Sequence, residues 1–215
     1  MKNRIVLLGP PASGKGTQAA LLGATFGLPH GSTGAMLRAE RAKGSPIGME
    51  ADSYTSKGLL FPDDLALRVV SQWLDDKTRF LLDGFPRTVG QAVAFDAFLA
   101  DQSLDLQIVY LLDLPDDEVR RRMLGRLTCS ACGAVFNETF HKISVENPCP
   151  QCQGKLARRS DDTEEALDHR LEQYHALTSP VADHYESAGL LKTIDVLPGR
   201  DEVYQVLYND IKEAA

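Results

Sequence analysis

The stretch RIVLLGPPASGKGT (residues 4–17) decides the fold of this chain. Its first residues, 4–9, form an apolar run that predicts a buried strand, and a segment with helical periodicity follows the motif directly. Gly9 and Gly14 allow a tight turn in which successive backbone N–H groups face an anion. Lys15 and the N-terminus of the helix add positive charge at the same point. We therefore predict a phosphate-binding loop between the first strand and the first helix.

The hydroxyl group in this loop departs from the usual pattern. Gly16 follows Lys15, and the hydroxyl comes one residue later, at Thr17. We therefore expect magnesium to be held here through water rather than by a direct side-chain contact. The alternative interpretation is a glycine-rich turn with a solvated lysine. It is disfavoured because the strand before the loop and the helix after it are the context that the phosphate-binding motif requires.

Apolar runs typical of strands alternate along the chain with segments of helical period. Runs that are apolar on both faces suit a parallel sheet covered by helices on each side, so an α/β fold is predicted. The expected strands are 4–9, 30–33, 79–84, 106–114 and 190–196. The expected helices are 15–26, 33–43, 62–75, 88–101, 115–127, 163–188 and 200–213, and Pro180 should kink the longest of them.

The composition is that of an ordinary globular protein. Hydrophobic residues make up 43% and charged residues 25% of the 215 residues, which suits one core with a small insertion. The 23 basic and 30 acidic residues give a formal net charge of −7, which argues against a general binder of nucleic acid or anionic membranes. The chain has neither a signal-peptide pattern nor an apolar run long enough to span a membrane. We expect a cytoplasmic protein whose thiols stay reduced.

A second motif, FLLDGFPRT (residues 80–88), is an apolar strand that ends in Asp83. A carboxylate at this strand end can orient the water shell of magnesium beside the phosphate loop. Taken alone, Asp83 could serve only to cap a loop. Arg87 follows closely and is expected to reach the same cleft.

All four cysteines lie in residues 128–158, where glycines and prolines interrupt the alternation of strands and helices. They form two C-x-x-C pairs, Cys129 with Cys132 and Cys149 with Cys152. Four thiolates fill a tetrahedral coordination sphere, so we expect one structural zinc ion with no open position for catalysis. Iron could occupy the same four sulfurs. Two disulfides are less compatible with a reducing compartment. A redox site would require exposed thiols near a βαβ unit, whereas two pairs that flank a loop have the spacing of metal ligands.

Together with STGAMLR (residues 32–38) and GRLTCSACG (residues 125–133), these motifs resemble those of the adenylate kinases, specifically the long bacterial type with a metal-bearing lid. The resemblance covers nearly the whole chain. It implies the P-loop nucleoside monophosphate kinase fold, with a five-stranded parallel sheet flanked by helices. By the same match, the core comprises 1–31, 62–127 and 159–215, the nucleoside monophosphate-binding domain 32–61, and the zinc lid 128–158.

The resemblance also implies which residues contact the two substrates. For ATP these are Ala12, Ser13, Gly14, Lys15, Gly16, Thr17, Arg126, Val135, Phe136 and Pro198. For AMP they are Thr33, Arg38, Leu59, Leu60, Phe61, Gly84, Phe85, Pro86, Arg87, Gln91, Arg159 and Arg170. The charges expected to serve catalysis are Lys15, Arg87, Arg122, Arg126, Arg159 and Arg170, while Asp83 would hold magnesium through water.

Three positions depart from the family pattern. Ala35 stands where aspartate is usual, Leu59 where lysine is common, and Leu127 where a second arginine often follows Arg126. Ala35 and Leu59 are not expected to take part in the chemistry, so we interpret them as adjustments of the small domain. Leu127 removes one positive charge from the cleft.

The reaction implied is the reversible transfer of the γ-phosphoryl group of magnesium-ATP to AMP, giving two ADP, by a monomer with no nucleic-acid or membrane partner. Because positioning and charge stabilisation suffice for this reaction, Asp161 and Asp162 are expected to position the lid rather than to act as general bases. Arg120, Arg121 and Arg158 are expected to be solvated or weakly paired. The alternatives are a kinase for another nucleoside monophosphate and, from the paired C-x-x-C motifs, a zinc-ribbon nucleic-acid-binding ATPase.

Overall fold

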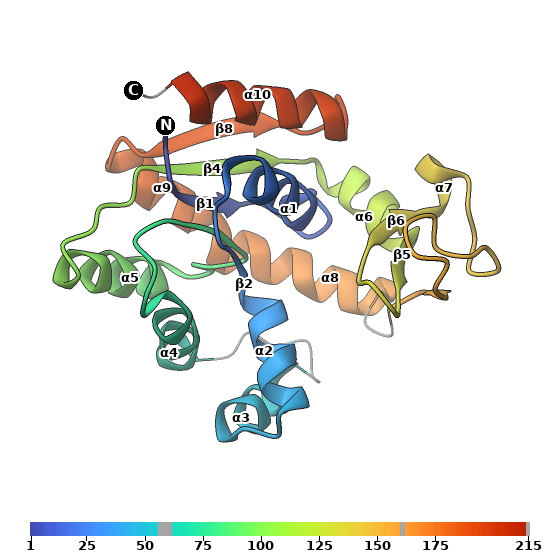
Figure 1. The fold of residues 1–215 in the computed structure, drawn as a ribbon, viewed down its shortest axis with the longest axis horizontal. Helices are drawn as coiled ribbons and strands as arrows, with labels where there is room; N and C mark the ends of the chain where they lie inside the picture. Colours follow the sequence, from blue (N-terminus) through green and yellow to red (C-terminus); the bar gives the residue numbers. More distant parts are fainter. Residues whose placement is uncertain (56–61, 160–161, 214–215) are drawn as a thin grey trace.

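The computed structural model describes residues 1–55, 62–159 and 162–213, apart from the side chains of Arg38, Asp52, Ser53 and Thr55. Its centre is a five-stranded sheet in the order β2-β3-β1-β4-β8 (Figure 1). The strands are β1 (Arg4–Leu8), β2 (His30–Ser32), β3 (Phe80–Asp83), β4 (Ile108–Asp113) and β8 (Leu191–Asp195). Every pairing between them is parallel, which confirms the predicted fold class.

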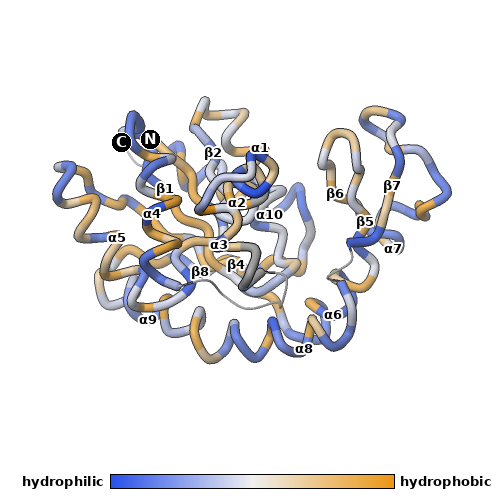
Figure 2. The backbone as a smooth tube through the Cα atoms, turned by 90° about the horizontal axis from the view of Figure 1, so that it is seen from below, coloured by the Kyte–Doolittle hydropathy of each residue, from blue (hydrophilic) through white to orange (hydrophobic). Residues whose placement is uncertain are grey.

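The middle strand β1 is buried on both faces. It pairs with β3, where Leu7 lies beside Asp83, and with β4 on its other edge. Successive residues of β1 enter different hydrophobic clusters, with Val6 on one side of the sheet and Ile5 on the other. This is why the strand is an unbroken apolar run rather than an alternating one. Figure 2 shows the apolar segments gathered around this sheet.

Helices cover the two faces of the sheet. One hydrophobic cluster joins the sheet to α1 (Lys15–Phe26), α6 (Asp116–Leu124), α8 (Glu164–Gln173) and α10 (Arg200–Glu213). The other joins it to α4 (Asp63–Leu74), α5 (Val89–Asp101) and α9 (Ser179–Ser187). In a doubly wound sheet of this kind, ligands bind at the carboxyl ends of the strands, and the phosphate loop lies at that edge.

The long helix predicted over residues 163–188 is helical throughout but interrupted. Between α8 and α9 lies a π-helical turn, η1 (Tyr174–Thr178), and Pro180 is in the first turn of α9. Proline has no N–H to donate, so the regular hydrogen-bond ladder cannot pass through it. The interruption therefore falls where the proline predicts it.

The chain between β2 and α4 contains one more helix than the sequence analysis expected. After α2 (Thr33–Ala42), the structure has α3 (Pro46–Thr55) in a segment with no predicted element. The two helices pack so closely that a Cβ on Gly48 would lie 2.5 Å from the carbonyl oxygen of Glu40. Gly48 thus serves helix packing, although a mid-helix glycine ordinarily weakens a helix.

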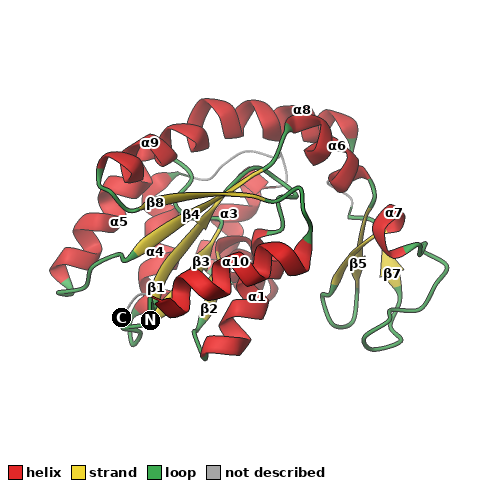
Figure 3. Cartoon of the chain, turned by 90° about the horizontal axis from the view of Figure 1, so that it is seen from above, coloured by secondary structure: helices red, strands yellow, loops and turns green. Residues whose placement is uncertain are grey.

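A second, three-stranded sheet lies in the segment predicted to be the lid and stands apart from the main sheet (Figure 3). Its strands are β5 (Arg126–Cys129), β6 (Val135–Asn137) and β7 (Leu156–Ala157), and the short helix α7 (Glu138–His141) follows β6. The prediction of a helix over 115–127 was wrong at its end, because α6 stops at Leu124. Beyond Gly125 the chain pairs with β6 and β7, and this tertiary pairing overrides the local helical preference.

None of the helices in the part of the chain that the structure describes has the length and apolar character needed to cross a membrane.

Candidate active site and metal centre

The phosphate-binding loop connects the end of β1 to the start of α1. Gly9 has a φ of 143°, and a Cβ there would lie 2.5 Å from the carbonyl oxygen of Leu112, so glycine is required. Ala12 and Gly14 also have positive φ values, of 57° and 91°, which turn the loop back on itself. Gly14 caps α1 without a side-chain hydrogen bond, so the N–H groups of the first turn can receive an anion.

Lys15 folds its side chain back over this loop. Its Nζ donates to the carbonyl oxygens of Gly9, at 2.9 Å, and Pro10, at 2.7 Å, and lies 3.3 Å from Ser13 Oγ. Ser13 is buried, whereas Gly16 and Thr17 at the start of α1 are exposed. The ammonium group is therefore held at the mouth of the loop, where phosphate oxygens can replace the carbonyl oxygens as its acceptors.

Charged residues from distant parts of the sequence lie near Lys15. The pKa of Lys15 is lowered from 10.5 to about 8, chiefly by burial; Asp83 opposes this shift, and Arg87 and Arg126 contribute to it. Two arginines from separate segments thus lie near the same ammonium group. In a chain with a formal net charge of −7, such a gathering of cations indicates an anion-binding site.

Asp83 ends β3 beside the phosphate loop and is 9% exposed. A Cβ on Gly16 would lie 3.2 Å from Asp83 Oδ2, which places the carboxylate against the start of α1. His30 on β2 has its Nε2 4.0 Å from the same oxygen. Burial lowers the pKa of His30, with Asp83 opposing, and Nε2 has no hydrogen-bond partner among the described residues. Asp83 is thus placed where it can orient water around magnesium beside the loop.

Four residues predicted to contact AMP are linked by hydrogen bonds. Thr33 Oγ1 and Arg87 Nε both donate to the carbonyl oxygen of Gly84, at 2.9 and 2.8 Å. The backbone N–H of Arg87 donates to Gln91 Oε1 at 2.8 Å. Residues from the start of α2, the loop after β3 and α5 therefore converge on one small area at the carboxyl edge of the sheet.

Phe85 and Pro86 lie between Gly84 and Arg87. The Phe85 side chain is 1% exposed and packs edge-to-face against Phe95, with ring centroids 5.3 Å apart. The Phe85–Pro86 peptide bond is cis. Because the phenyl ring is committed to the core, this segment can offer a ligand little besides its backbone.

Asp162 gathers two of the predicted arginines. Arg126 donates to both carboxylate oxygens, with its Nε 2.7 Å from Oδ2, and Arg170 Nη1 lies 3.6 Å from Oδ1. The Asp162 side chain is only 2% exposed. Burial lowers the pKa of Arg87, Asp83 opposes this shift, and Arg170 contributes to it. The carboxylate therefore orients two arginines.

Arg159 and Arg122 lie elsewhere around the base of the lid. Arg159 Nε donates to Thr128 Oγ1 on β5 at 3.1 Å. Arg122 Nε donates to Glu118 Oε1 at 2.7 Å, and its Nη2 donates to the carbonyl oxygen of Val196 at 3.0 Å. The structure thus places Arg122 next to the segment leading to Pro198 and does not join it by a described hydrogen bond to the Asp162 cluster.

The predicted adenine contacts of the lid differ in exposure. Val135 is 44% exposed, but Phe136 is only 8% exposed and packs in the small hydrophobic cluster of the lid. Phe136 could therefore meet adenine mainly through its backbone. Leu127, at the position of the missing second arginine, is fully buried in the same cluster, so an arginine there would have to displace the cluster. Pro198 is exposed in the loop between β8 and α10.

Three arginines expected to be surface residues are indeed paired at the surface. Arg120 pairs with Asp168, Arg121 with Glu118 at 2.7 Å, and Arg158 with Glu138, and each arginine side chain is about half exposed. Such exposed pairs contribute little to stability.

Some predicted residues fall outside what the structure describes. These are Leu59, Leu60, Phe61 and Asp161, together with the side chain of Arg38.

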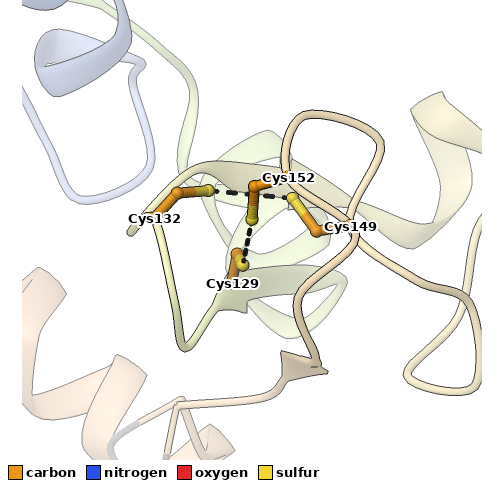
Figure 4. A group of neighbouring side chains, drawn as sticks. All are labelled: Cys129, Cys132, Cys149 and Cys152. Carbon is orange, nitrogen blue, oxygen red and sulfur yellow. Dashed lines mark hydrogen bonds between the residues drawn. The ribbon is translucent and has the colours of Figure 1, made fainter.

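The four cysteines form one compact cluster in the lid (Figure 4). Their Sγ atoms all lie within 4.8 Å of one another, with Cys129 and Cys152 at 3.5 Å and Cys132 and Cys149 at 3.8 Å. Four sulfurs at about 2.3 Å from a central zinc ion would be roughly 3.8 Å apart in a tetrahedron. The spacing therefore fits a metal ion held by four thiolates, and the cysteines form no disulfide.

The surroundings of the cluster favour metal binding. Backbone N–H groups of Cys132 and Ala131 lower the pKa of Cys129, whereas, against the opposing N–H group of Gly154, the neighbouring Cys132 and Cys129 side chains raise the pKa of Cys152. A Cβ on Gly154 would lie 2.8 Å from Ala131 Cβ and 3.1 Å from Cys129 Sγ. Only glycine at position 154 lets the turn after Cys152 approach the sulfurs this closely.

Two residues of the site were missed by the sequence analysis. Asp63 accepts a hydrogen bond from Gln91, although 28 positions separate them, and His30 lies beside Asp83. Neither belongs to a motif with fixed spacing, so only the fold brings them to the site. His30 could have been suspected because it lies two residues before the STGAMLR motif, at the start of β2.

The fold and the site define an α/β nucleotide-binding protein with a phosphate-binding loop and a four-cysteine lid. Comparison with known proteins narrows this class. The family model described as adenylate kinase matches residues 7–190. An adenylate kinase of Thermodesulfovibrio yellowstonii is 43% identical over 204 residues, covering 94% of this chain and 95% of that protein. One from Carboxydothermus hydrogenoformans is 39% identical over 213 residues, covering 98% of this chain and 100% of that protein. The chain belongs to the adenylate kinase family and is a phosphotransferase.

Proposed function

We propose that the chain catalyses the reversible transfer of the γ-phosphoryl group of magnesium-ATP to AMP, giving two ADP. The observation that carries this proposal is the gathering of Lys15, Arg87, Arg126 and Arg170 around one site in an acidic chain. Phosphoryl transfer spreads negative charge over equatorial oxygens, so planar donors and an ammonium group at fixed positions are what the reaction needs.

The two substrates would approach this cluster from opposite sides. Residues 12–17 would hold the ATP phosphates through backbone N–H groups and Lys15, with Arg126, Val135, Phe136 and Pro198 around the nucleotide. Thr33, Arg38, residues 59–61 and 84–87, and Gln91 would hold AMP. The lysine then meets the β- and γ-phosphates, while Arg87 meets the phosphate of AMP.

The remaining arginines would complete the site around the transferred group. Arg122, Arg159 and Arg170 would surround the phosphates once the lid has closed, and Arg170 is already oriented by Asp162. Magnesium, when bound with ATP, supplies charge neutralisation at the phosphates. Asp83 would orient its water shell from the end of β3.

We assign the lid metal to zinc. Tetrahedral tetrathiolate coordination leaves no open position, so the ion would be structural. The division of the chain then follows the resemblance, with a core of 1–31, 62–127 and 159–215, a monophosphate-binding domain of 32–61 and a lid of 128–158 that closes over ATP. Closure of such a lid would exclude water from the reaction and act as a gating step in catalysis. We also propose that the protein acts as a cytoplasmic monomer.

The test is a coupled assay of phosphoryl transfer from ATP to AMP, CMP, UMP and GMP in turn. The proposal predicts rapid transfer to AMP and at least about tenfold lower kcat/KM for each other acceptor. A preference for CMP, UMP or GMP would replace it by a kinase for another base. Salt-dependent binding to a random oligonucleotide, with ATP hydrolysis and no transfer, would favour the nucleic-acid-binding ATPase instead.

A further inference from the structure

The side-chain amide of Gln91 is held by two partners of opposite polarity. Its Nε2 donates to Asp63 Oδ1 at 2.9 Å, and its Oε1 accepts from the backbone N–H of Arg87 at 2.8 Å. Gln91 itself is only 2% exposed. The amide therefore lies buried between an acceptor that cannot donate and a donor that cannot accept.

This arrangement fixes which way the amide points. A rotation of the amide by half a turn would place Oε1 against the Asp63 carboxylate and the NH₂ group against the Arg87 N–H. Both contacts would be unfavourable, because an ionised carboxylate only accepts hydrogen bonds and a backbone N–H only donates them. Of the two partners, the carboxylate forms the stronger, charge-assisted hydrogen bond.

The Asp63 carboxylate is itself held in place, although the residue lies at the exposed start of α4. Thr88 Oγ1 lies 3.0 Å from both carboxylate oxygens and can donate to either. A Cβ on Gly90 would lie 2.6 Å from Asp63 Oδ2, so the absence of a side chain at Gly90 admits the carboxylate. The position of Asp63 against Gln91 is thus determined by two residues of the turn into α5.

The fixed amide keeps one N–H and one lone pair beyond these two bonds among the described residues. A purine base presents different polarity at its position 6. Adenine carries an amino group there, which donates, whereas the 6-oxopurines carry a carbonyl oxygen, which accepts. An amide oxygen pointing at position 6 suits adenine, and an amide NH₂ group at the same point suits a 6-oxopurine.

We propose that Asp63 is a specificity-determining residue that acts through Gln91. By fixing the orientation of the amide, it makes the monophosphate site select a 6-aminopurine over a 6-oxopurine. This inference rests on the proposed function, in which Gln91 contacts the base of AMP. Asp63 does not touch the substrate and is a positioning residue.

The experiment compares AMP with IMP, which differs from AMP at position 6 and in the proton on N1. In Asp63→Asn the new amide can turn either its oxygen or its NH₂ group toward Gln91, so the charge-assisted preference is lost and only the Arg87 N–H still favours the original orientation of Gln91. We expect the ratio of kcat/KM for IMP to that for AMP to rise about tenfold, as expected when a charge-assisted hydrogen bond no longer selects one orientation.

Asp64→Asn is the matched control. Asp64 lies in the same first turn of α4, and its side chain is 76% exposed and 3.8 Å from Arg68. Both substitutions remove one negative charge near the helix N-terminus and should lower helix stability similarly. Only Asp63→Asn should change the IMP-to-AMP ratio, which a purely structural role of Asp63 would leave unchanged.

Gly90→Ala is a second variant that leaves Asp63 intact. The added methyl group should displace the carboxylate from Gln91, while alanine favours the helix more than glycine does. The same rise in the ratio is expected. An unchanged ratio in folded Asp63→Asn and Gly90→Ala proteins would overturn the inference. If the unmodified protein transferred no phosphoryl group to AMP, the proposed function itself would fail, so the two failures are distinguishable.

Discussion

The main sheet and the lid are stabilised by different means. Around β1, residues such as Ile5, Val6 and Leu7 are completely buried within two large hydrophobic clusters. The buried cluster of the lid has five members, Leu127, Cys129, Phe136, Cys149 and Leu156, and two of these are cysteines. Hydrophobic burial alone can stabilise the first region, whereas the proposed zinc ion would supply part of the stability of the second. A substitution that destabilises one region should therefore leave the other region folded.

The charges of the candidate site lie between these two regions. Lys15 begins α1 and Arg87 lies in the loop after β3, whereas Arg126 begins the first strand of the lid. Loss of either region should therefore impair phosphoryl transfer for a different reason. The loss of a core charge removes electrostatic stabilisation, and the loss of the lid metal removes the support of Arg126.

The largest expected effect is that of Lys15→Met. The side chain contacts carbonyl oxygens of the loop, where phosphate would bind, so its removal should lower kcat by about 10³-fold, the size found when one catalytic donor is lost. Steady-state kinetics measure the loss, and metal analysis should find the zinc content unchanged. Near-normal turnover in the folded variant would show that the phosphate loop is not the site.

Arg87→Ala should have the next largest effect, with a decrease in kcat/KM of about 10²-fold, because a charged donor to phosphate is lost. Arg120→Ala is the control, since Arg120 forms only an exposed pair with Asp168. We expect its kcat/KM to stay within about twofold of the unmodified value. Equal and small losses in both variants would place the cleft elsewhere.

A smaller effect is expected for Gly154→Ala, which acts on the lid alone. The new Cβ would press on Ala131 and Cys129, so affinity for zinc should fall about tenfold, as for other residues that support metal ligands. Competition with a chelator measures this affinity. Restoring space in Gly154→Ala/Ala131→Gly should recover part of it, and unchanged affinity in Gly154→Ala would contradict the cluster geometry.

The smallest effect is a pH dependence of the core site. The pKa of Lys15 is lowered to about 8, so in the free protein the group is charged below this pH and neutral above it. Since kcat/KM reports the free protein, kcat/KM for ATP should fall a few-fold, roughly threefold to tenfold, between pH 7.5 and 9. At saturating ATP the bound phosphates keep Lys15 charged, so kcat/KM for AMP should stay level. A parallel fall in both would point to another group.

Much of the main sheet could be predicted from the sequence because its signals are local. Apolar runs, a glycine-rich turn and the C-x-x-C spacing each need only neighbouring residues to be recognised. Helix α3 was missed because Pro46 and Gly48 are typical of loops, although Ile47, Ala51 and Tyr54 follow a helical spacing. Gly48 is explained only by the close approach of α2, which no local pattern reveals.

The motif residues of the candidate site could be predicted from the sequence, whereas the contacts that support them could not. Asp83 and Arg87 stand in one short motif, so their proximity to the phosphate loop follows from strand order. Asp63 becomes part of the site because α4 and α5 pack side by side. Asp162 orients Arg126 and Arg170, and these three residues come from three separate segments of the chain. The strand at Arg126 was misread as helix because its pairing partners lie beyond the metal-binding turn.

Hydrogen exchange of Cys149→Ala and of the unmodified protein, both prepared with zinc present, tests the central contrast most directly. Cys149 is fully buried in the lid, and three thiolates should not hold a structural ion stably. We predict loss of stoichiometric zinc and faster exchange throughout residues 126–157, while amides of β1 and β4 keep their protection. Retention of one zinc ion per chain, or an equal rise in exchange in the lid and in the main sheet, would contradict the account.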